Sequence, residues 1–217
     1  QVITNNLNGQ FAPAKGQITL TKINPPKRVL RDSPIAKGDY ELYSKEEFIQ
    51  YFPHDAYGKE NEKENWQKEN PVVAQSFDTN KSKSIDVNPT NWKEGYYVLK
   101  GWILDGKDSI QTERLVYLFK NDKKQPTDNE LFALNLNKNS YKPGETAQIQ
   151  IASAANDSEV LVELEHDGKI IKTDKIKLNN NVNKFSFPID EKYRGNVFVH
   201  YYFGKFNTAK QGTLAVN

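Results

Sequence analysis

The sequence predicts an all-β chain of two tandem immunoglobulin-like β-sandwiches, the first of which carries a small helical insertion. Apolar and polar residues alternate in many short segments, and this period of two is typical of strands packed on one side only. Gly, Pro, Asn and Asp residues separate the segments as turns. Gly95 and Gly195 each begin an aromatic strand that ends in a hairpin, which indicates a repeat of about 100 residues with about seven strands in each half.

The best-specified local element is the turn at Pro143–Gly144. Proline fixes φ for the second position of a β-turn, and glycine adopts the positive φ that a type II turn requires next. Residues 147–151 then alternate Ala or Ile with Gln, and residues 132–136 alternate in the same way before the turn. The turn therefore joins two amphipathic strands of the second half.

The remaining strands are inferred from the same alternation. Asp105–Gly106 and Asp167–Gly168 are strong signals for two-residue hairpins. The first half is expected to hold strands at 2–4, 18–23, 72–77, 85–87, 95–104 and 115–119. The second half is expected to hold further strands at 160–164, 169–171, 185–189, 195–203 and 212–216.

Residues 38–71 break the alternation and predict the helical insertion. Residues 44–47 form a capping box, in which a Ser hydroxyl and a Glu carboxylate satisfy free amides at a helix start. Residues 48–52 give the short helix an apolar side, and Pro53 ends it. The stretch 59–70 is dense in Glu and Lys, which predicts a solvated helix or a mobile arm. This surface insertion is expected to be anchored by two aromatic residues, Tyr57 and Trp66.

The domain boundary is placed in the polar, aperiodic segment 120–130, whose composition is typical of a short interdomain linker. The predicted domains are residues 1–125, which include the insertion, and residues 126–217. Both halves are long enough to bury a core.

The composition argues against several classes of partner and site. Thirty Lys and Arg nearly balance 28 Asp and Glu and are scattered, so no nucleic-acid or anionic-membrane partner is expected. The absence of Cys excludes disulfides, thiolate metal sites and a Cys nucleophile. No apolar run approaches the roughly 18 residues of a membrane span. Because the chain begins at Gln1 without a signal-peptide pattern, we expect it to come from a longer or processed protein.

No catalytic residue, metal ligand or cofactor site is expected, and the chain is predicted not to be an enzyme. There is no Gly-x-Ser-x-Gly motif, and the carboxylate pairs Glu163/Glu165 and Asp105/Asp108 are interpreted as solvated groups rather than the acid pair of a glycosidase. The histidines lack the i,i+4 spacing of a zinc site; they are His54, His166 and His200.

Two further stretches carry weaker signals of ligand binding. Residues 78–82 resemble the start of an EF-hand, but Lys83 replaces the required Gly and Pro89 replaces the bidentate Glu, so no calcium site is expected. Aromatic strand residues could form a platform that stacks on sugar rings, although such rings more often fill a sandwich core. The residues concerned are Tyr96, Trp102 and Tyr201.

With these motifs in order, the chain resembles the macroglobulin-like domains of bacterial alpha-2-macroglobulins. Residues 141–147 (YKPGETA) resemble the Y-x-P-G-E-x-A beginning of such a domain, and residues 193–199 and 95–98, the latter leading to Asp105–Gly106, carry the rest of the likeness. The resemblance covers both halves and implies two macroglobulin-like β-sandwiches, with the insertion in the first.

What the resemblance implies is a non-catalytic structural segment of a protease inhibitor that traps endopeptidases in the bacterial cell envelope, either periplasmic or surface-exposed. Its expected partners are neighbouring macroglobulin-like domains of the same parent chain, and proteases are targets of the full-length protein. A reactive thioester cannot lie in a segment without Cys, and no bait region is evident. The alternative is a surface carbohydrate-binding or adhesive β-sandwich pair.

Overall fold

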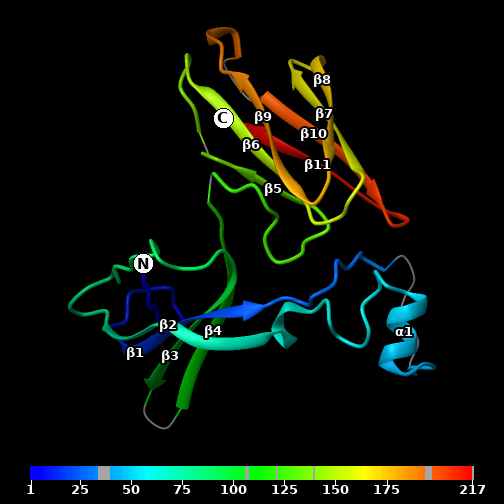
Figure 1. Cartoon of the computed structure of the whole chain (residues 1–217). Helices are drawn as coiled ribbons and strands as arrows, with labels where there is room; N and C mark the ends of the chain where they lie inside the picture. Colours follow the sequence, from blue (N-terminus) through cyan, green and yellow to red (C-terminus); the bar gives the residue numbers. More distant parts are fainter. Residues whose placement is uncertain (34–39, 106–107, 121, 139, 194–196, 217) are drawn as a thin grey trace. The chain divides into compact units, whose positions relative to one another are not determined.

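The computed structural model describes residues 1–217 except 34–39, 106–107, 121, 139, 194–196 and 217. Strands cover 50% of the chain and helices 6%, which confirms the all-β class. In chain order the elements are β1 (Lys15–Asn24), α1 (Lys45–Tyr51), η1 (Lys63–Asn65), β2 (Gln67–Asp78), β3 (Gly95–Asp105), β4 (Asp108–Leu118), β5 (Ala133–Leu136), β6 (Thr146–Ser153), β7 (Ser158–His166), β8 (Lys169–Leu178), β9 (Asn181–Pro188), η2 (Glu191–Tyr193), β10 (Val197–Lys205) and β11 (Thr208–Val216) (Figure 1).

The chain forms two compact units that differ from the predicted division. The first unit contains residues 1–25 and 66–119, and the second contains residues 26–65 and 120–217. Residues 26–65, most of which belong to the predicted first domain, therefore make their contacts within the second unit. The division at 125/126 stays a prediction.

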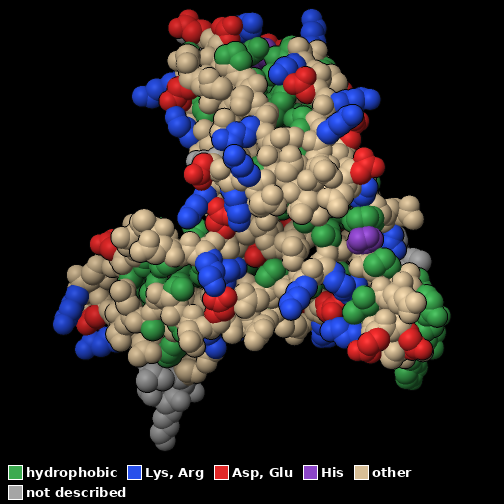
Figure 2. Space-filling view, viewed as in Figure 1, with side chains coloured by type: hydrophobic (Ala, Val, Ile, Leu, Met, Phe, Trp, Pro, Cys, Tyr) green, Lys and Arg blue, Asp and Glu red, His purple; other side chains and the backbone are tan. Residues whose placement is uncertain are grey.

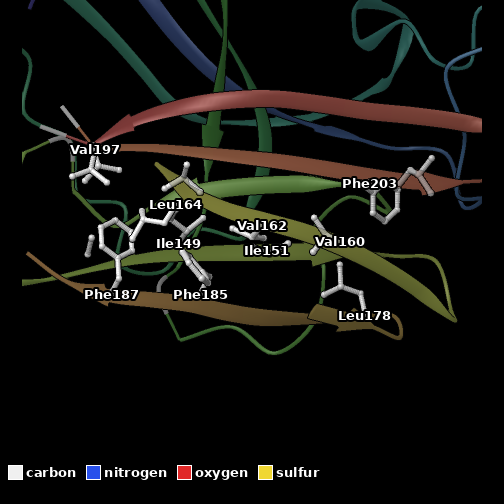
Figure 3. Packing of buried hydrophobic residues seen from close by; sticks show 14 of the residues in the cluster. Ile149, Ile151, Val160, Val162, Leu164, Leu178, Phe185, Phe187, Val197 and Phe203 are labelled. Atoms are coloured by element: carbon white, nitrogen blue, oxygen red, sulfur yellow. The ribbon is translucent and has the colours of Figure 1, made fainter. Parts of the chain in front are cut away.

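The second unit contains a β-sandwich of two antiparallel sheets, with strand orders β11-β10-β7-β8 and β5-β6-β9. Ile149 and Ile151 of β6 are fully buried against Val160 and Val162 of β7 in one cluster. Figure 3 shows these side chains in the space between the strands. Because inward and outward residues alternate along each strand, the apolar alternation in the sequence becomes the core.

Three tight turns of the second unit contain residues with positive φ, a backbone conformation that Gly, Asn and Asp adopt most readily. Gly144 has φ +88°, and the Glu145 N–H donates to the Lys142 carbonyl at 3.1 Å, which confirms the predicted turn. Asp167 and Gly168 have φ of 48° and 72° and join β7 to β8, as predicted. Both residues of the β10–β11 turn, Phe206–Asn207, also have positive φ, the geometry that matches the twist of a two-residue hairpin.

The first unit contains a single four-stranded antiparallel sheet among its described residues, with strand order β2-β1-β3-β4. This is fewer than the seven or so strands expected. Its buried cluster is small and centres on Leu20, Val73 and Tyr97. Strands β3 and β4 pair from Gly95↔Leu118 to Asp105↔Asp108, which confirms the hairpin, although Gly106 lies outside the described residues.

Two predicted strands of the first unit are absent, and local hydrogen bonds explain why. Residues 2–4 lie outside any strand and are followed by the isolated bridge Asn5↔Phe11. Here the Asn6 side chain accepts from the amides of residues 8 and 10 and closes a turn. Residues 85–87 are flanked by turns in which the Ser82 hydroxyl and the Asn88 amide oxygen accept backbone N–H groups.

The structure confirms the predicted helix at the start of the insertion, but the insertion ends before residue 71, because β2 begins at Gln67. Ser44 and Glu47 form both halves of the capping box of α1. The stretch 59–70, however, is not one continuous helix. Only residues 63–65 form the short helix η1, and β2 begins at Gln67 and pairs with the end of β1 through Asn24↔Gln67. Strand pairing thus overrides the charged composition. Pro71 is tolerated because β2 is an edge strand and a register shift lies beside it.

Candidate functional site

The most connected group of polar side chains lies in residues 26–33 and 40–65, which we call the arm. Arg31 makes a two-pronged ion pair with Asp55, at 2.7 Å from Nε and 2.8 Å from Nη2. Arg28 donates to the Pro53 and Asp55 carbonyls at 2.9 and 3.0 Å and also pairs with Glu60. Two guanidinium groups therefore hold an irregular segment in one conformation, since their planar donors fit carboxylate and carbonyl oxygens.

The arm is fastened to the turn between β10 and β11. Arg31 Nη1 donates to the Phe206 carbonyl at 2.5 Å, and the His54 ring stacks on the Phe206 ring with centroids 3.4 Å apart and planes inclined by 14°. Lys210 of β11 pairs with Asp32 at 2.8 Å. The positive φ of Phe206 is unusual for an aromatic residue, and these contacts help to fix it.

The hydrogen bonds and ion pairs of the arm favour the charged forms of Glu60 and Arg31. Burial alone would raise the pKa of Glu60, but hydrogen bonds from the Tyr57 N–H, Lys45 and Arg28 outweigh it and lower that pKa. The hydrogen bond to Asp55 raises the pKa of Arg31. The arm is therefore an electrostatically locked structural element at neutral pH.

Apolar side chains are exposed on the arm around α1. Figure 2 shows hydrophobic side chains at the surface in the region of α1. Tyr40 and Leu42 are almost fully exposed, and Tyr51 and Phe52 are partly exposed. Phe48 packs against Phe52 and Tyr57, so Tyr57 anchors the helix within the arm. Trp66 instead contacts Tyr96 in the first unit.

The three histidines lie in different surroundings. His54 stacks on Phe206 as described, and His166 lies edge-on against Tyr193 with centroids 4.9 Å apart. His166 Nδ1 is buried and has no hydrogen-bond partner among the residues that the structure describes. Among the described residues, no group of three or more His, Asp or Glu side chains is placed to hold a metal ion.

One polar cluster escaped the sequence analysis. His200 Nε2 lies 2.6 Å from Glu165 Oε2, and its Nδ1 lies 2.8 Å from the Thr213 hydroxyl. A hydroxyl, an imidazole and a carboxylate in a row are the groups of a nucleophilic triad. Here they belong to three adjacent strands, β11, β10 and β7, and the arrangement acts as a cross-strand hydrogen-bond network. Its only sequence signal is strand register, which a single sequence does not reveal.

The acidic side chains that the sequence offered as catalytic or calcium-binding candidates make structural contacts where the structure describes them. Glu165 bonds to His200, whereas the side chains of Asp105 and Asp108 lie outside the described residues. Residues 78–82 form the turn that ends β2, where the Asp78 carboxylate accepts from the Asn80 N–H at 3.1 Å. The Thr79 hydroxyl is buried and bonds to Ala14. This stretch is therefore a turn that ties β2 to β1.

The three aromatic residues considered for a sugar platform lie in different places. Tyr201 packs at the edge of the sandwich core, with its ring centroid 5.5 Å from that of Phe132. Tyr96 packs against Trp66 and Tyr117 in the first unit. Trp102 lines a groove of about 740 Å³ together with Gln17, Ser76, Asp78 and Lys81. Only Trp102 among the three therefore borders this described groove.

A second hollow lies on the first unit, over the strands that carry Leu99 and Ile110. It has a volume of about 510 Å³ and is bordered by residues 1–5 on one side. Its lining is mostly apolar, with Arg114 as a charged member. The two hollows give the first unit its candidate binding surfaces.

No helix within the described residues has the length and apolar character needed to cross a membrane. No curated protein matches the chain. Residues 132–216 match a family model described as the alpha-2-macroglobulin bait region domain. This match spans the sandwich of the second unit from the residue before β5 to the end of β11. The C-terminal sandwich is thus similar to a bait region domain of alpha-2-macroglobulins.

Proposed function

We propose that the chain is a non-catalytic structural segment of a bacterial macroglobulin-like protein that traps endopeptidases at the cell envelope. The observation that carries the proposal is the match of residues 132–216 to the bait region domain. Its partners are neighbouring macroglobulin-like domains of the same parent chain, and proteases are targets of the assembled protein.

The arrangement of the second unit supports a mechanical role. The sandwich has a closed apolar core, and the arm is locked to its β10–β11 turn by an ion pair, a ring stack and a hydrogen bond. Such an element transmits force between domains, because packed cores and ion-paired segments move as rigid bodies. The chemistry of trapping then belongs to the parent.

The test compares this chain with its full-length parent in a protease assay that uses one large protein substrate and one small peptide substrate. The parent is expected to suppress cleavage of the large substrate and to spare the small one, because a trapped protease keeps its active site. The chain alone is expected to suppress neither. Suppression of the large substrate by the chain alone would contradict the structural role, and suppression of both would indicate direct blocking of an active site.

Two parent variants sharpen this test. Val162→Asp places a charge in the fully buried core and is expected to abolish trapping. Val72→Asp changes a valine that is 40% exposed in an edge strand and is expected to leave trapping unchanged. Equal trapping by both variants would show that the sandwich is not needed.

A second candidate function is carbohydrate binding in the Trp102 groove. Indole rings stack on the apolar faces of sugars, and Gln17, Ser76 and Lys81 border the same groove. The test is calorimetric titration of the full chain with cellohexaose and chitohexaose. Saturable binding that is lost in Trp102→Ala and kept in Tyr202→Ala, an exposed aromatic of the second unit, would support this function. Absence of binding to either sugar would count against it.

A further inference from the structure

The hollow of about 510 Å³ on the first unit is bordered by one face of the sheet and by residues 1–5. Hydrogen bonds hold these first residues in place. The Val2 N–H donates to the Lys83 carbonyl at 2.9 Å, and the Thr4 hydroxyl donates to the Ala12 carbonyl at 2.6 Å. The volume lies within the range of small-molecule pockets, about 300–1,000 Å³. The hollow therefore has the size and the fixed border of a small-ligand site.

The floor of the hollow follows the register of strands β3 and β4. Three cross-strand pairs line it, which are Ile103↔Ile110, Gly101↔Thr112 and Leu99↔Arg114. Because residues two apart in a strand point to the same face, these pairs form a strip with an apolar end at Ile110 and a charged end at Arg114. The strand from Ile110 to Arg114 spans about 13 Å. The strip is therefore matched to an extended ligand rather than a compact one.

Gly101 lies in the middle of this strip. It belongs to β3, which has β1 and β4 as neighbours on its two sides. A glycine in the interior of a strand often marks a place where a ligand approaches the backbone closely. A Cβ added at Gly101 would lie 3.3 Å from Thr112 Cγ2 and 3.9 Å from Ile18 Cγ2, and both of these residues line the hollow. The missing side chain therefore leaves room at the centre of the strip.

Arg114 supplies the charge of the strip. It is exposed, and it is the one charged side chain among the described residues that line the hollow. Within the described part of the chain, no hydrogen bond or ion pair involves its guanidinium group. A guanidinium binds a carboxylate through two parallel hydrogen bonds, whereas Ile103 and Ile110 favour contact with hydrocarbon. The strip is therefore complementary to a hydrocarbon chain that ends in one carboxylate.

We propose that the hollow binds an alkyl monocarboxylate, a free fatty acid of about ten carbons whose extended length matches the strip. Its carboxylate pairs with Arg114, and its chain lies over Gly101 toward Ile110. This inference goes beyond the proposed function, because it rests on the first unit and not on the match of residues 132–216.

The experiment titrates the full chain with decanoate and with decanol, at concentrations below those at which either compound aggregates. Calorimetry measures the affinities, and nuclear magnetic resonance locates the ligand. Decanoate is expected to bind saturably and to show nuclear Overhauser contacts with the methyl groups of Ile103 and Ile110. Decanol has the same chain without the charge and is expected to bind at least about tenfold more weakly, the loss typical of a charge-assisted hydrogen bond.

Arg114→Gln tests the charged end of the strip. This variant is expected to bind decanoate at least about tenfold more weakly and decanol unchanged. Lys100→Gln is the matched control, because Lys100 is a cation of β3 that pairs with Glu113 on the opposite face of the sheet. It is expected to bind both compounds unchanged. A general effect of net charge would instead weaken decanoate equally in the two variants.

Ile110→Asp tests the apolar end. Ile110 is 56% exposed, and its replacement is expected to weaken both compounds at least about tenfold, because the apolar contact is lost. Leu115→Asp is the matched control, since Leu115 is 44% exposed on the same strand but points to the opposite face. It is expected to leave both affinities unchanged. Unchanged far-ultraviolet circular dichroism establishes that each variant is folded.

Four results would overturn the proposal. The first is no saturable binding of decanoate, and the second is an affinity for decanol equal to that for decanoate. The third is equal weakening of decanoate in Arg114→Gln and Lys100→Gln, or in Ile110→Asp and Leu115→Asp. The fourth is ligand contacts confined to the second unit, because the ligand would then bind elsewhere.

Discussion

In the second unit fifteen apolar residues are buried in one cluster between two sheets, whereas the buried cluster of the first unit has three members, Leu20, Val73 and Tyr97. Yet the four-stranded sheets of the two units share their strand order and antiparallel pairing, so that β1, β2, β3 and β4 correspond to β7, β8, β10 and β11. Backbone pairing and burial are therefore separable here. Strand order follows from the hairpins and their register, while a deep core requires a second layer.

The connections between corresponding strands also differ. Strands β7 and β8 are joined by the two residues Asp167–Gly168, with His166 paired to Lys169. The corresponding strands β1 and β2 are joined by the whole of residues 25–66, with Asn24 paired to Gln67. A pair of adjacent strands can therefore keep its pairing when a long connection replaces the tight turn, provided that this connection has contacts of its own.

The largest expected effect is a cavity in the sandwich core. Ile149→Ala is expected to destabilise the second unit by about 2–5 kcal/mol, because Ile149 is fully buried and the removed atoms leave a void. Ile110→Ala in the first unit is expected to change stability by no more than about 0.5 kcal/mol. Hydrogen exchange of the β6 and β10 amides measures the stability of the second unit. Tryptophan fluorescence measures that of the first unit, because all three Trp residues lie there. Equal losses in the two variants would remove the contrast between the units.

The next effect concerns the turn that begins β6. Gly144→Val is expected to lower stability by about 1–3 kcal/mol, since its φ of +88° is strained for a β-branched residue. Gly144→Asn is expected to cost less, because Asn tolerates positive φ. No heavy atom lies within 4 Å of the position of an added Cβ, so packing does not confuse the comparison. Coincident thermal melts of the two variants would show that the turn does not require this backbone.

A smaller effect is expected when the long connection is made short. Replacing residues 25–66 by Asp-Gly would join the paired residues Asn24 and Gln67 in the manner of Asp167–Gly168. The β1 amides are expected to stay protected from exchange, while the β10–β11 turn loses its contacts with Arg31 and His54. Loss of protection throughout β1 would mean that the arm is needed for the sheet itself.

The smallest effect is the pH dependence of the arm. The folded pKa of Glu60 lies below its ordinary value of 4.5, so its contribution is complete above that value and is lost as pH falls through the lower folded pKa. Amides of residues 40–65 are expected to exchange faster, after correction for intrinsic rates, at about pH 3 than at pH 7. In Glu60→Gln this difference is expected to shrink. An unchanged difference would assign the pH dependence to other carboxylates.

The elements predicted well from sequence are those fixed by local chemistry. The turn at Pro143–Gly144, the capping box at Ser44 and the hairpin at Asp167–Gly168 each depend on a few adjacent residues. Alternation located strands β6, β7, β9 and β10 of the second unit because their inward apolar residues are buried in one core. Alternation does not reveal how many strands pack into a layer, so the single four-stranded sheet described in the first unit could not be foreseen.

The elements missed from sequence depend on partners far along the chain. Residues 67–70 look like a solvated segment but pair with the end of β1. The contact of His200 with Glu165 requires the register of β7 against β10. The fastening of Arg31 to Phe206 joins residues 175 positions apart. Local composition contains no signal for any of these contacts.

The positions of Asn24 and Gln67 have a practical consequence for protein engineering. Because these two residues are strand neighbours, the arm leaves and re-enters the sheet at adjacent points, as the termini of a compact guest domain would. The tip of the corresponding hairpin, between Asp167 and Gly168, is therefore the natural insertion point in the second sandwich. A fluorescent or enzymatic guest placed there would report on the movement of this domain while leaving the β7–β8 register intact.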